Sequence, residues 1–117
     1  MEVVNKKVLV IGLGLSGIST IKTLSSLKAD VYSYDDKEQS ELEVVFEKLK
    51  DFNFKFIKNY MDLDFDFIVK SPGIKPTNKI IEFFSEEGKG QLIFTTHNTT
   101  LLNTLRKYNN SIDFINE

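Results

Sequence analysis

A glycine-rich segment near the N-terminus has the spacing of a phosphate-binding loop. Residues 12–17 read Gly-Leu-Gly-Leu-Ser-Gly, and they follow an apolar run at residues 8–11. Such a run is typical of a strand that is buried on both faces of a parallel sheet. Glycines at this spacing permit a tight turn, a close approach of the backbone to an anion, and close packing of the next helix. We therefore expect the amides around Gly14, Leu15 and Ser16 to hold a diphosphate at the N-terminus of that helix.

An acidic pair follows at the distance where a dinucleotide-binding domain has its ribose-binding acid. Asp35 and Asp36 lie about twenty residues beyond the loop, directly after the apolar segment 31–34. A carboxylate there would accept hydrogen bonds from a ribose or a base. The spacing suits both a nicotinamide dinucleotide and a nucleotide sugar, so it leaves both open. Lys37 follows, but no basic residue replaces the acids, and a 2′-phosphate is therefore not expected.

A third segment is expected at the same edge as the loop and the acids. Residues 65–69 have the pattern of a strand, and Ser71, Pro72 and Gly73 after it predict a turn. In a doubly wound sheet, ligands bind outside the carboxyl ends of the strands. The alternative is purely structural: the glycines would serve strand–helix packing, and the aspartates would cap the next segment.

Strand-like and helix-like segments alternate along the chain. Alternation of this kind implies right-handed β-α-β crossovers and a parallel sheet. We predict one α/β domain over residues 1–117, a doubly wound, mainly parallel, Rossmann-like sheet with helices on both faces. The predicted strands are residues 8–11, 31–34, 54–57, 65–69, 92–94 and 112–115, and the predicted helices are residues 16–28, 42–49, 76–84 and about 99–108.

Composition excludes several classes of protein. The 117 residues are 41% hydrophobic and 27% charged, which fits a globular domain. A net charge of −2 gives no electrostatic footprint for nucleic acid. No apolar run approaches a membrane span, and no signal-peptide pattern is present. Because there are no cysteines, a disulfide framework and a thiolate metal site are excluded, and we expect a cytoplasmic location.

The glycine-rich loop, residues 34–37 (Tyr-Asp-Asp-Lys) and residues 68–74 (Ile-Val-Lys-Ser-Pro-Gly-Ile) together carry a family resemblance. Residues 7 to about 88 resemble the N-terminal domain of the Mur ligases, most closely of the glutamate-adding members. The resemblance implies that the loop takes the diphosphate of a UDP-linked muramoyl precursor and that the acid after the second strand lies against uracil and ribose. The UDP-binding residues that it implies are Gly12, Gly14, Leu15, Ser16, Gly17, Asp35, Asp36, Lys37, Ser71, Pro72 and Gly73.

The resemblance departs from a whole ligase in what should follow. Mur ligases use ATP and magnesium in a second domain with a G-x-x-G-K-[ST] loop, and a third domain binds the amino acid. The only Gly-Lys pair here, Gly88 and Lys89, is followed by Gly90 instead of a hydroxyl residue. We therefore expect this chain to bind the precursor without catalysing ligation alone, with no catalytic residue and no cofactor of its own.

The tail over residues 89–117 is atypical of the family. Residues 90–102 weakly resemble the switch-histidine region of ABC- and SMC-like ATPases, in which Thr-Thr-His ends a strand. Alternatively, the tail simply completes the sheet. His97 is the single histidine, and no Walker motif or second metal ligand accompanies it, so we expect a surface or turn residue and no metal site.

Two other functions stay open from the sequence. The loop and Asp35 suit NAD equally well, as in the NAD-binding domain of a dehydrogenase or of a redox regulator. The second alternative is a non-catalytic interaction domain or a truncated frame, which would self-associate through an unpaired sheet edge.

Overall fold

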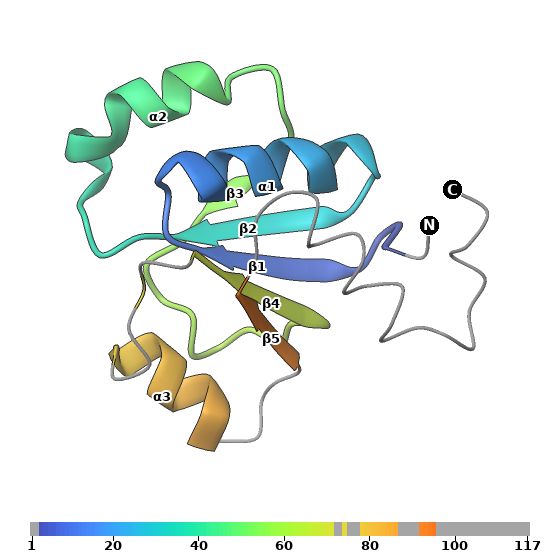
Figure 1. The fold of residues 1–117 in the computed structure, drawn as a ribbon, viewed down its shortest axis with the longest axis vertical. Helices are drawn as coiled ribbons and strands as arrows, with labels where there is room; N and C mark the ends of the chain where they lie inside the picture. Colours follow the sequence, from blue (N-terminus) through green and yellow to red (C-terminus); the bar gives the residue numbers. More distant parts are fainter. Residues whose placement is uncertain (1–2, 72–73, 75–77, 87–91, 96–117) are drawn as a thin grey trace.

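The computed structural model describes residues 3–71, 74, 78–86 and 92–95. Its strands form one five-stranded sheet in the order β3-β2-β1-β4-β5, and every strand pair is parallel (Figure 1). The strands are β1 (Lys7–Ile11), β2 (Asp30–Tyr34), β3 (Lys55–Phe56), β4 (Phe67–Lys70) and β5 (Leu92–Thr95). The helices are α1 (Leu15–Ser26), the short 3-10 helix η1 (Gln39–Leu42), α2 (Glu43–Lys48) and α3 (Lys79–Glu86).

The chain winds outward from the middle of the sheet in two directions. From β1 it passes through α1 to β2 and through α2 to β3; it then returns to β4 beside β1 and continues through α3 to β5. Helices α1 and α2 therefore cover one face, and α3 covers the other (Figure 1). The strand order reverses between β1 and β4, which is where ligands bind in folds of this kind. The predicted doubly wound α/β fold is confirmed.

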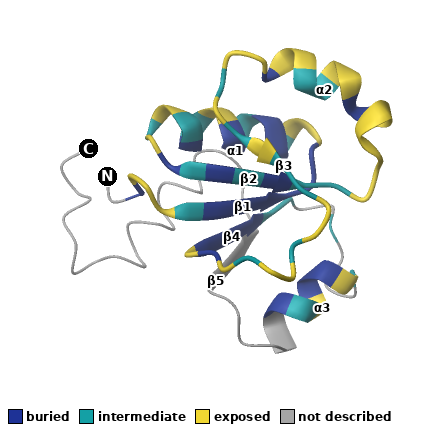
Figure 2. Cartoon of the chain, turned by 180° about the vertical axis from the view of Figure 1, so that it is seen from behind, coloured by how far each residue is buried: buried dark blue, intermediate teal, exposed yellow. Residues whose placement is uncertain are grey.

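Two hydrophobic cores hold the helices against the sheet. In β1, Val8 and Val10 face the core under α1, whereas Leu9 and Ile11 face the core under α3. These four side chains are at most 1% exposed, which is why the run is apolar without alternation. In Figure 2, β1 is coloured as buried beyond its first residue, and it lies between β2 and β4.

Helix α1 meets the sheet through one apolar stripe. Ile18, Ile21 and Leu24 recur at helical spacing, and all three are buried. The helix ends at Ser26 instead of Lys28, because Lys28 adopts a left-handed conformation with φ of 67°. The Ala29 N–H then donates to the Leu24 carbonyl oxygen at 3.1 Å, which turns the chain into β2.

The third and fourth strands are shorter than expected because side-chain packing takes over at their ends. Strand β3 has two residues, and the rings of Phe54 before the strand and Phe56 within it pack on Phe46 of α2. Phe65 precedes β4, and it is buried against Tyr32 and Phe84 with ring centroids 5.4 and 5.9 Å apart. Asp66 then accepts a hydrogen bond from the Lys7 N–H at 2.9 Å, and the strand begins one residue later.

Several sequence predictions fall outside the described residues. These are the turn at Pro72 and Gly73, the Gly88–Gly90 region, His97, and the helix and strand expected over residues 99–115. Where the structure describes the chain, no helix is long and apolar enough to cross a membrane.

Candidate functional site

The ends of β1, β2 and β4 are joined at one edge of the sheet. The Gly12 N–H donates to the Tyr34 carbonyl oxygen at 2.8 Å, and the Ser71 N–H donates to the Ile11 carbonyl oxygen at 3.0 Å. The start of the glycine-rich loop therefore lies between Tyr34, the last residue of β2, and Ser71, which follows β4. The glycine-rich loop, the end of β2 and Ser71 of the third segment share one edge, as predicted.

Two glycines of the loop are required by the fold itself. Gly12 has φ of +96°, and a Cβ there would lie 2.9 Å from Ser71 Oγ. A Cβ on Gly17 would overlap the carbonyl oxygen of Gly12. The structural explanation of the motif thus holds for these two positions: they allow α1 to pack tightly against the end of β1.

Gly14 differs from the other two glycines. It is the N-cap residue of α1, with φ of −81°, a value that any residue adopts. A Cβ there would meet no heavy atom of the described residues within 4 Å. Neither packing nor backbone conformation therefore accounts for a glycine at position 14, and the space beside it is open to a ligand.

The first turn of α1 is suited to an anion. Gly14, the N-cap residue, has no side chain that could cap the helix, and the first turn holds no acidic residue. The first amides of an α-helix have no carbonyl partner within the helix, and its dipole favours negative charge there. Leu13 is buried, whereas the Leu15 side chain is 81% exposed and Ser16 is half-buried.

Asp35 connects the acidic segment to the glycine-rich loop. One carboxylate oxygen accepts a hydrogen bond from the Leu13 N–H at 2.8 Å, and the other accepts from the Lys37 N–H at 2.9 Å. The second contact closes a local Asx turn. Asp35 thus accepts hydrogen bonds from two backbone N–H groups of the protein, and in this way it fixes the shape of both loops at this edge.

Asp36 faces a different set of partners. Its carboxylate accepts hydrogen bonds from Tyr34 Oη and from Asn78 Nδ2, both at 3.1 Å. Burial, together with the hydrogen bond to Asp36, raises the pKa of Tyr34 to about 12. The Tyr34 hydroxyl therefore remains a donor at neutral pH. Asn78 also accepts from the Ile80 N–H at 3.1 Å, so Asp36 is linked to the start of α3.

Lys58 belongs to this edge although the sequence did not point to it. Its ammonium group donates to the carbonyl oxygens of Asp35, Asp36 and Lys37 at 2.9, 3.4 and 3.2 Å. A signal was available: Lys58 follows the predicted strand 54–57, and the carboxyl ends of parallel strands share one edge. A lone lysine after an edge strand otherwise resembles any solvated surface residue.

Ser71 closes the site from the β4 side. Its hydroxyl donates to the Gly12 carbonyl oxygen at 3.1 Å. The neighbouring Lys70 ammonium donates to the Ile74 carbonyl oxygen at 2.9 Å. These contacts hold the end of β4 beside the positive-φ glycine. The other two residues expected here, Pro72 and Gly73, lie outside the described residues.

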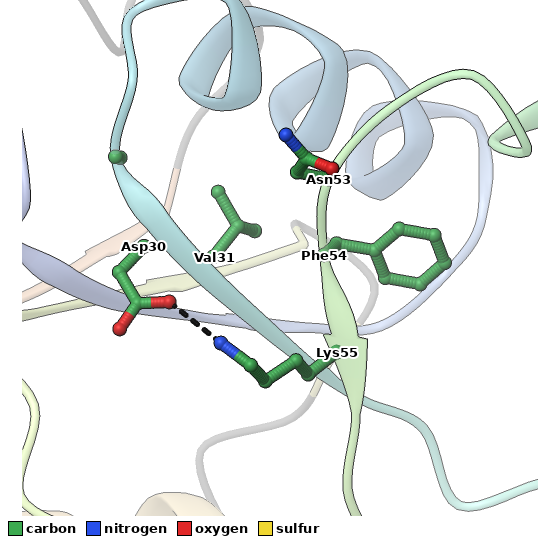
Figure 3. A pocket seen from close by; sticks show the side chains of 6 residues that line it. Asp30, Val31, Asn53, Phe54 and Lys55 are labelled. Atoms are coloured by element: carbon green, nitrogen blue, oxygen red, sulfur yellow. Dashed lines mark hydrogen bonds and ion pairs between the residues drawn. The ribbon is translucent and has the colours of Figure 1, made fainter.

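A pocket of about 240 Å³ lies at the opposite edge of the sheet. Figure 3 shows its lining, in which Asp30 begins β2, Lys55 begins β3, and their side chains form an ion pair at 2.9 Å. The hydrogen bond to Asp30 raises the pKa of Lys55. This pocket is separate from the glycine-rich loop, which follows the carboxyl ends of the strands. Within the described part of the chain, no group of three or more histidine, cysteine or acidic side chains is placed to hold a metal.

Comparison with known proteins gives one consistent family. Residues 6–92 match the family described as Mur ligase MurD-like, N-terminal domain. The UDP-N-acetylmuramoylalanine–D-glutamate ligase of Thermoanaerobacter pseudethanolicus is 45% identical over 98 residues, which cover 80% of this chain and 21% of that protein. The ligase of the same name from Clostridium tetani is 36% identical over 72% of this chain and 19% of its own length. The chain thus spans about a fifth of the length of these relatives.

Solved structures of low sequence identity share the fold. The UDP-N-acetylmuramate–alanine ligase MurC of Thermotoga maritima aligns with 89% of this chain and 24% of its own, at a TM-score of 0.62 and 21% identity. A 3-hydroxyacyl-CoA dehydrogenase of Archaeoglobus fulgidus aligns with 78% of this chain and 34% of its own, at a TM-score of 0.53 and 23% identity.

Proposed function

Because this chain belongs to the family of MurD-like Mur ligase N-terminal domains, we propose that its glycine-rich edge binds the UDP part of a UDP-linked muramoyl precursor. The curated relatives are ligases whose names specify UDP-N-acetylmuramoylalanine and D-glutamate. In this proposal the chain holds the nucleotide end of that substrate class. The residues that form the site are those at the ends of β1, β2 and β4.

The observation that carries the proposal is the open space at Gly14. Gly12 and Gly17 are explained by a positive φ and by strand–helix packing, but Gly14 has neither constraint. Gly14 stands at the start of α1, where backbone amides and the helix dipole favour a diphosphate. A glycine at this place lets the backbone approach the diphosphate without a side chain between them.

The acidic segment supports the nucleoside half of the proposal. Asp35, Asp36 and Lys37 follow β2 directly, and Asp35 is tied to the loop through Leu13. A nucleoside attached to a diphosphate at Gly14 would extend toward this segment. We assign to it the uracil and ribose contacts, with Asp35 acting at least in part by fixing the two loops relative to one another.

The ligation reaction is assigned to a longer protein. Since the chain spans about a fifth of its relatives, amide-bond formation with ATP and magnesium would require residues beyond those described here. We propose no catalytic residue and no cofactor for this domain. A cytoplasmic location is part of the proposal, and the absence of cysteine from the sequence agrees with it.

Calorimetric titration of this chain tests the proposal. We expect UDP-N-acetylmuramoyl-alanine and UDP to bind, and NAD to bind more weakly or not at all. Gly14→Val should abolish binding of the uridine nucleotides while the protein stays folded by circular dichroism. Tighter binding of NAD than of any uridine nucleotide would overturn the proposal.

Self-association through a sheet edge is a separate prediction. Strand β3 forms one edge, has two residues and carries the exposed Lys55, and such features disfavour strand addition. Light scattering at high protein concentration tests this: we expect no association through the β3 edge, so any dimer would pair through β5, the other edge strand.

A further inference from the structure

The Lys58 side chain is directed to the end of β2 by the neighbouring strand. The Ile57 N–H donates to the Ser33 carbonyl oxygen at 2.9 Å and extends the pairing of β3 with β2 by one residue. The Lys58 ammonium lies 5.2 Å from the ring centroid of Tyr34 and 5.8 Å from that of Phe56. Two aromatic rings therefore hold the cation at this edge, and its side chain is 41% exposed.

Three consecutive carbonyl groups point at this one cation. They belong to residues 35–37, and each lies within 3.4 Å of Lys58 Nζ. An ammonium group has three donors and no acceptor, so this set matches its hydrogen-bonding capacity. The Glu38 carboxylate is 3.9 Å away and 74% exposed, and an ion pair of that kind contributes little. The hydrogen bonds to the three carbonyl oxygens are therefore the main polar interactions of the ammonium group.

The acidic loop, defined as residues 35–37, is thus held from two sides. Its carbonyl groups face Lys58, and the Asp35 carboxylate faces the Leu13 N–H of the glycine-rich loop. With both constraints, the loop has one defined path past the start of α1. Without the ammonium group, water would donate to these carbonyl groups, so the folded state would lose little free energy at this exposed site. The loop would, however, no longer be held in one conformation.

We propose that Lys58 is a positioning residue for nucleoside recognition: it holds the acidic loop in the conformation that contacts the base and ribose, and it does not itself bind the diphosphate. This inference rests on the proposed function, because it concerns the nucleoside half of the same site. It adds a residue that follows β3, a strand whose end supplied none of the residues expected from the sequence.

The test compares Lys58→Met, which keeps the stem and loses the donors, with Lys58→Arg and with Glu38→Gln as the matched control. Calorimetry gives the affinity of each variant for UDP, ADP and inorganic pyrophosphate. We expect Lys58→Met to bind UDP about tenfold more weakly and to lose most of its preference for UDP over ADP, since a factor of ten corresponds to one lost interaction of ordinary strength. Pyrophosphate affinity should stay within about twofold, because the first turn of α1 is unchanged. Lys58→Arg should recover part of the preference, and Glu38→Gln should behave as the parent.

The outcomes separate this inference from the proposed function. A parent protein that binds no UDP overturns the proposed function, and the recognition role with it. If the parent binds UDP and Lys58→Met keeps the same affinity and the same UDP-to-ADP ratio, the inference alone is overturned. An equal loss of UDP and pyrophosphate in Lys58→Met also overturns it, because the effect would then not be specific to the nucleoside.

Discussion

The carboxylate of Asp35 accepts a hydrogen bond from the backbone N–H of Leu13 at 2.8 Å, so a side chain joins the segments that follow β1 and β2. Leu13 is buried, which makes its N–H costly to leave without an acceptor. The residue expected to accept hydrogen bonds from a ligand is therefore also part of the loop architecture. Its substitution should affect stability and binding together.

Asp35→Ala should lower both the free energy of unfolding and the affinity for UDP. Loss of the acceptor leaves the N–H groups of Leu13 and Lys37 without their partner, and we expect a destabilisation of about 1–3 kcal/mol. The loss of binding free energy for UDP should be of the same size, about 1–3 kcal/mol. Urea denaturation and calorimetric titration of the same preparation measure the two effects.

Asp36→Ala serves as the control for Asp35→Ala. Within the described part of the chain, the partners of its carboxylate are Tyr34 and Asn78, neither of which belongs to the glycine-rich loop. We expect a smaller loss of UDP affinity than for Asp35→Ala. A larger loss would show that Asp36 is the main acid of the site and that Asp35 only supports the backbone.

The glycines of the loop should separate into folding and binding positions. Gly17→Ala places a Cβ against the carbonyl group of Gly12, and we expect a loss of about 3 kcal/mol or more in the free energy of unfolding. Gly14→Val enters open space at an ordinary φ, so the melting temperature should change little while uridine-nucleotide binding is lost. Thermal denaturation with and without UDP distinguishes the two. A Gly14→Val protein that UDP stabilises as much as the parent would remove Gly14 from the site.

The sheet and its helical layers could be predicted because their signals are local. The apolar run of β1 and the helical stripe of α1 each depend on residues close together in the sequence, and the parallel order follows from the alternation of strands and helices. The limits of β3 and β4 could not be predicted in this way. They depend on aromatic rings of other elements, such as Phe46 of α2 and Phe84 of α3, which pack on residues at the ends of these strands.

The orientation of the site side chains could not be predicted from the sequence for a related reason. The spacing of Asp35 from the loop predicts that the two meet, but a carboxylate can face a ligand or a backbone N–H at the same spacing. The structure selects the Leu13 N–H, 22 residues away. The three contacts of Lys58 depend on the path of one short edge strand, and no motif encodes that path.

The hydroxyl of Tyr34 should make stability fall at high pH. Its pKa is raised to about 12 in the folded protein, against an ordinary value of 10.0. A raised pKa means that the folded state keeps the proton longer than the unfolded state, so the contribution is complete below pH 10 and is lost as the pH rises toward 12. Urea denaturation at several pH values across this window should show a steeper fall for the parent than for Tyr34→Phe. Identical slopes would mean that the phenol titrates normally.

The contact between Asp36 and Asn78 should couple the acidic loop to α3. Asn78 Nδ2 donates to the Asp36 carboxylate at 3.1 Å, and its Oδ1 accepts from the Ile80 N–H at the first turn of the helix. A double-mutant cycle with Asp36→Ala, Asn78→Ala and the double variant isolates this pair, and we expect a coupling of about 0.5–1 kcal/mol because both groups are exposed to water. Asn78→Ala also removes the acceptor for Ile80, so it should destabilise the protein more than Asp36→Ala by about 1 kcal/mol. Additive effects in the cycle would show that the loop and α3 are held independently, with Asp36 acting only through Tyr34.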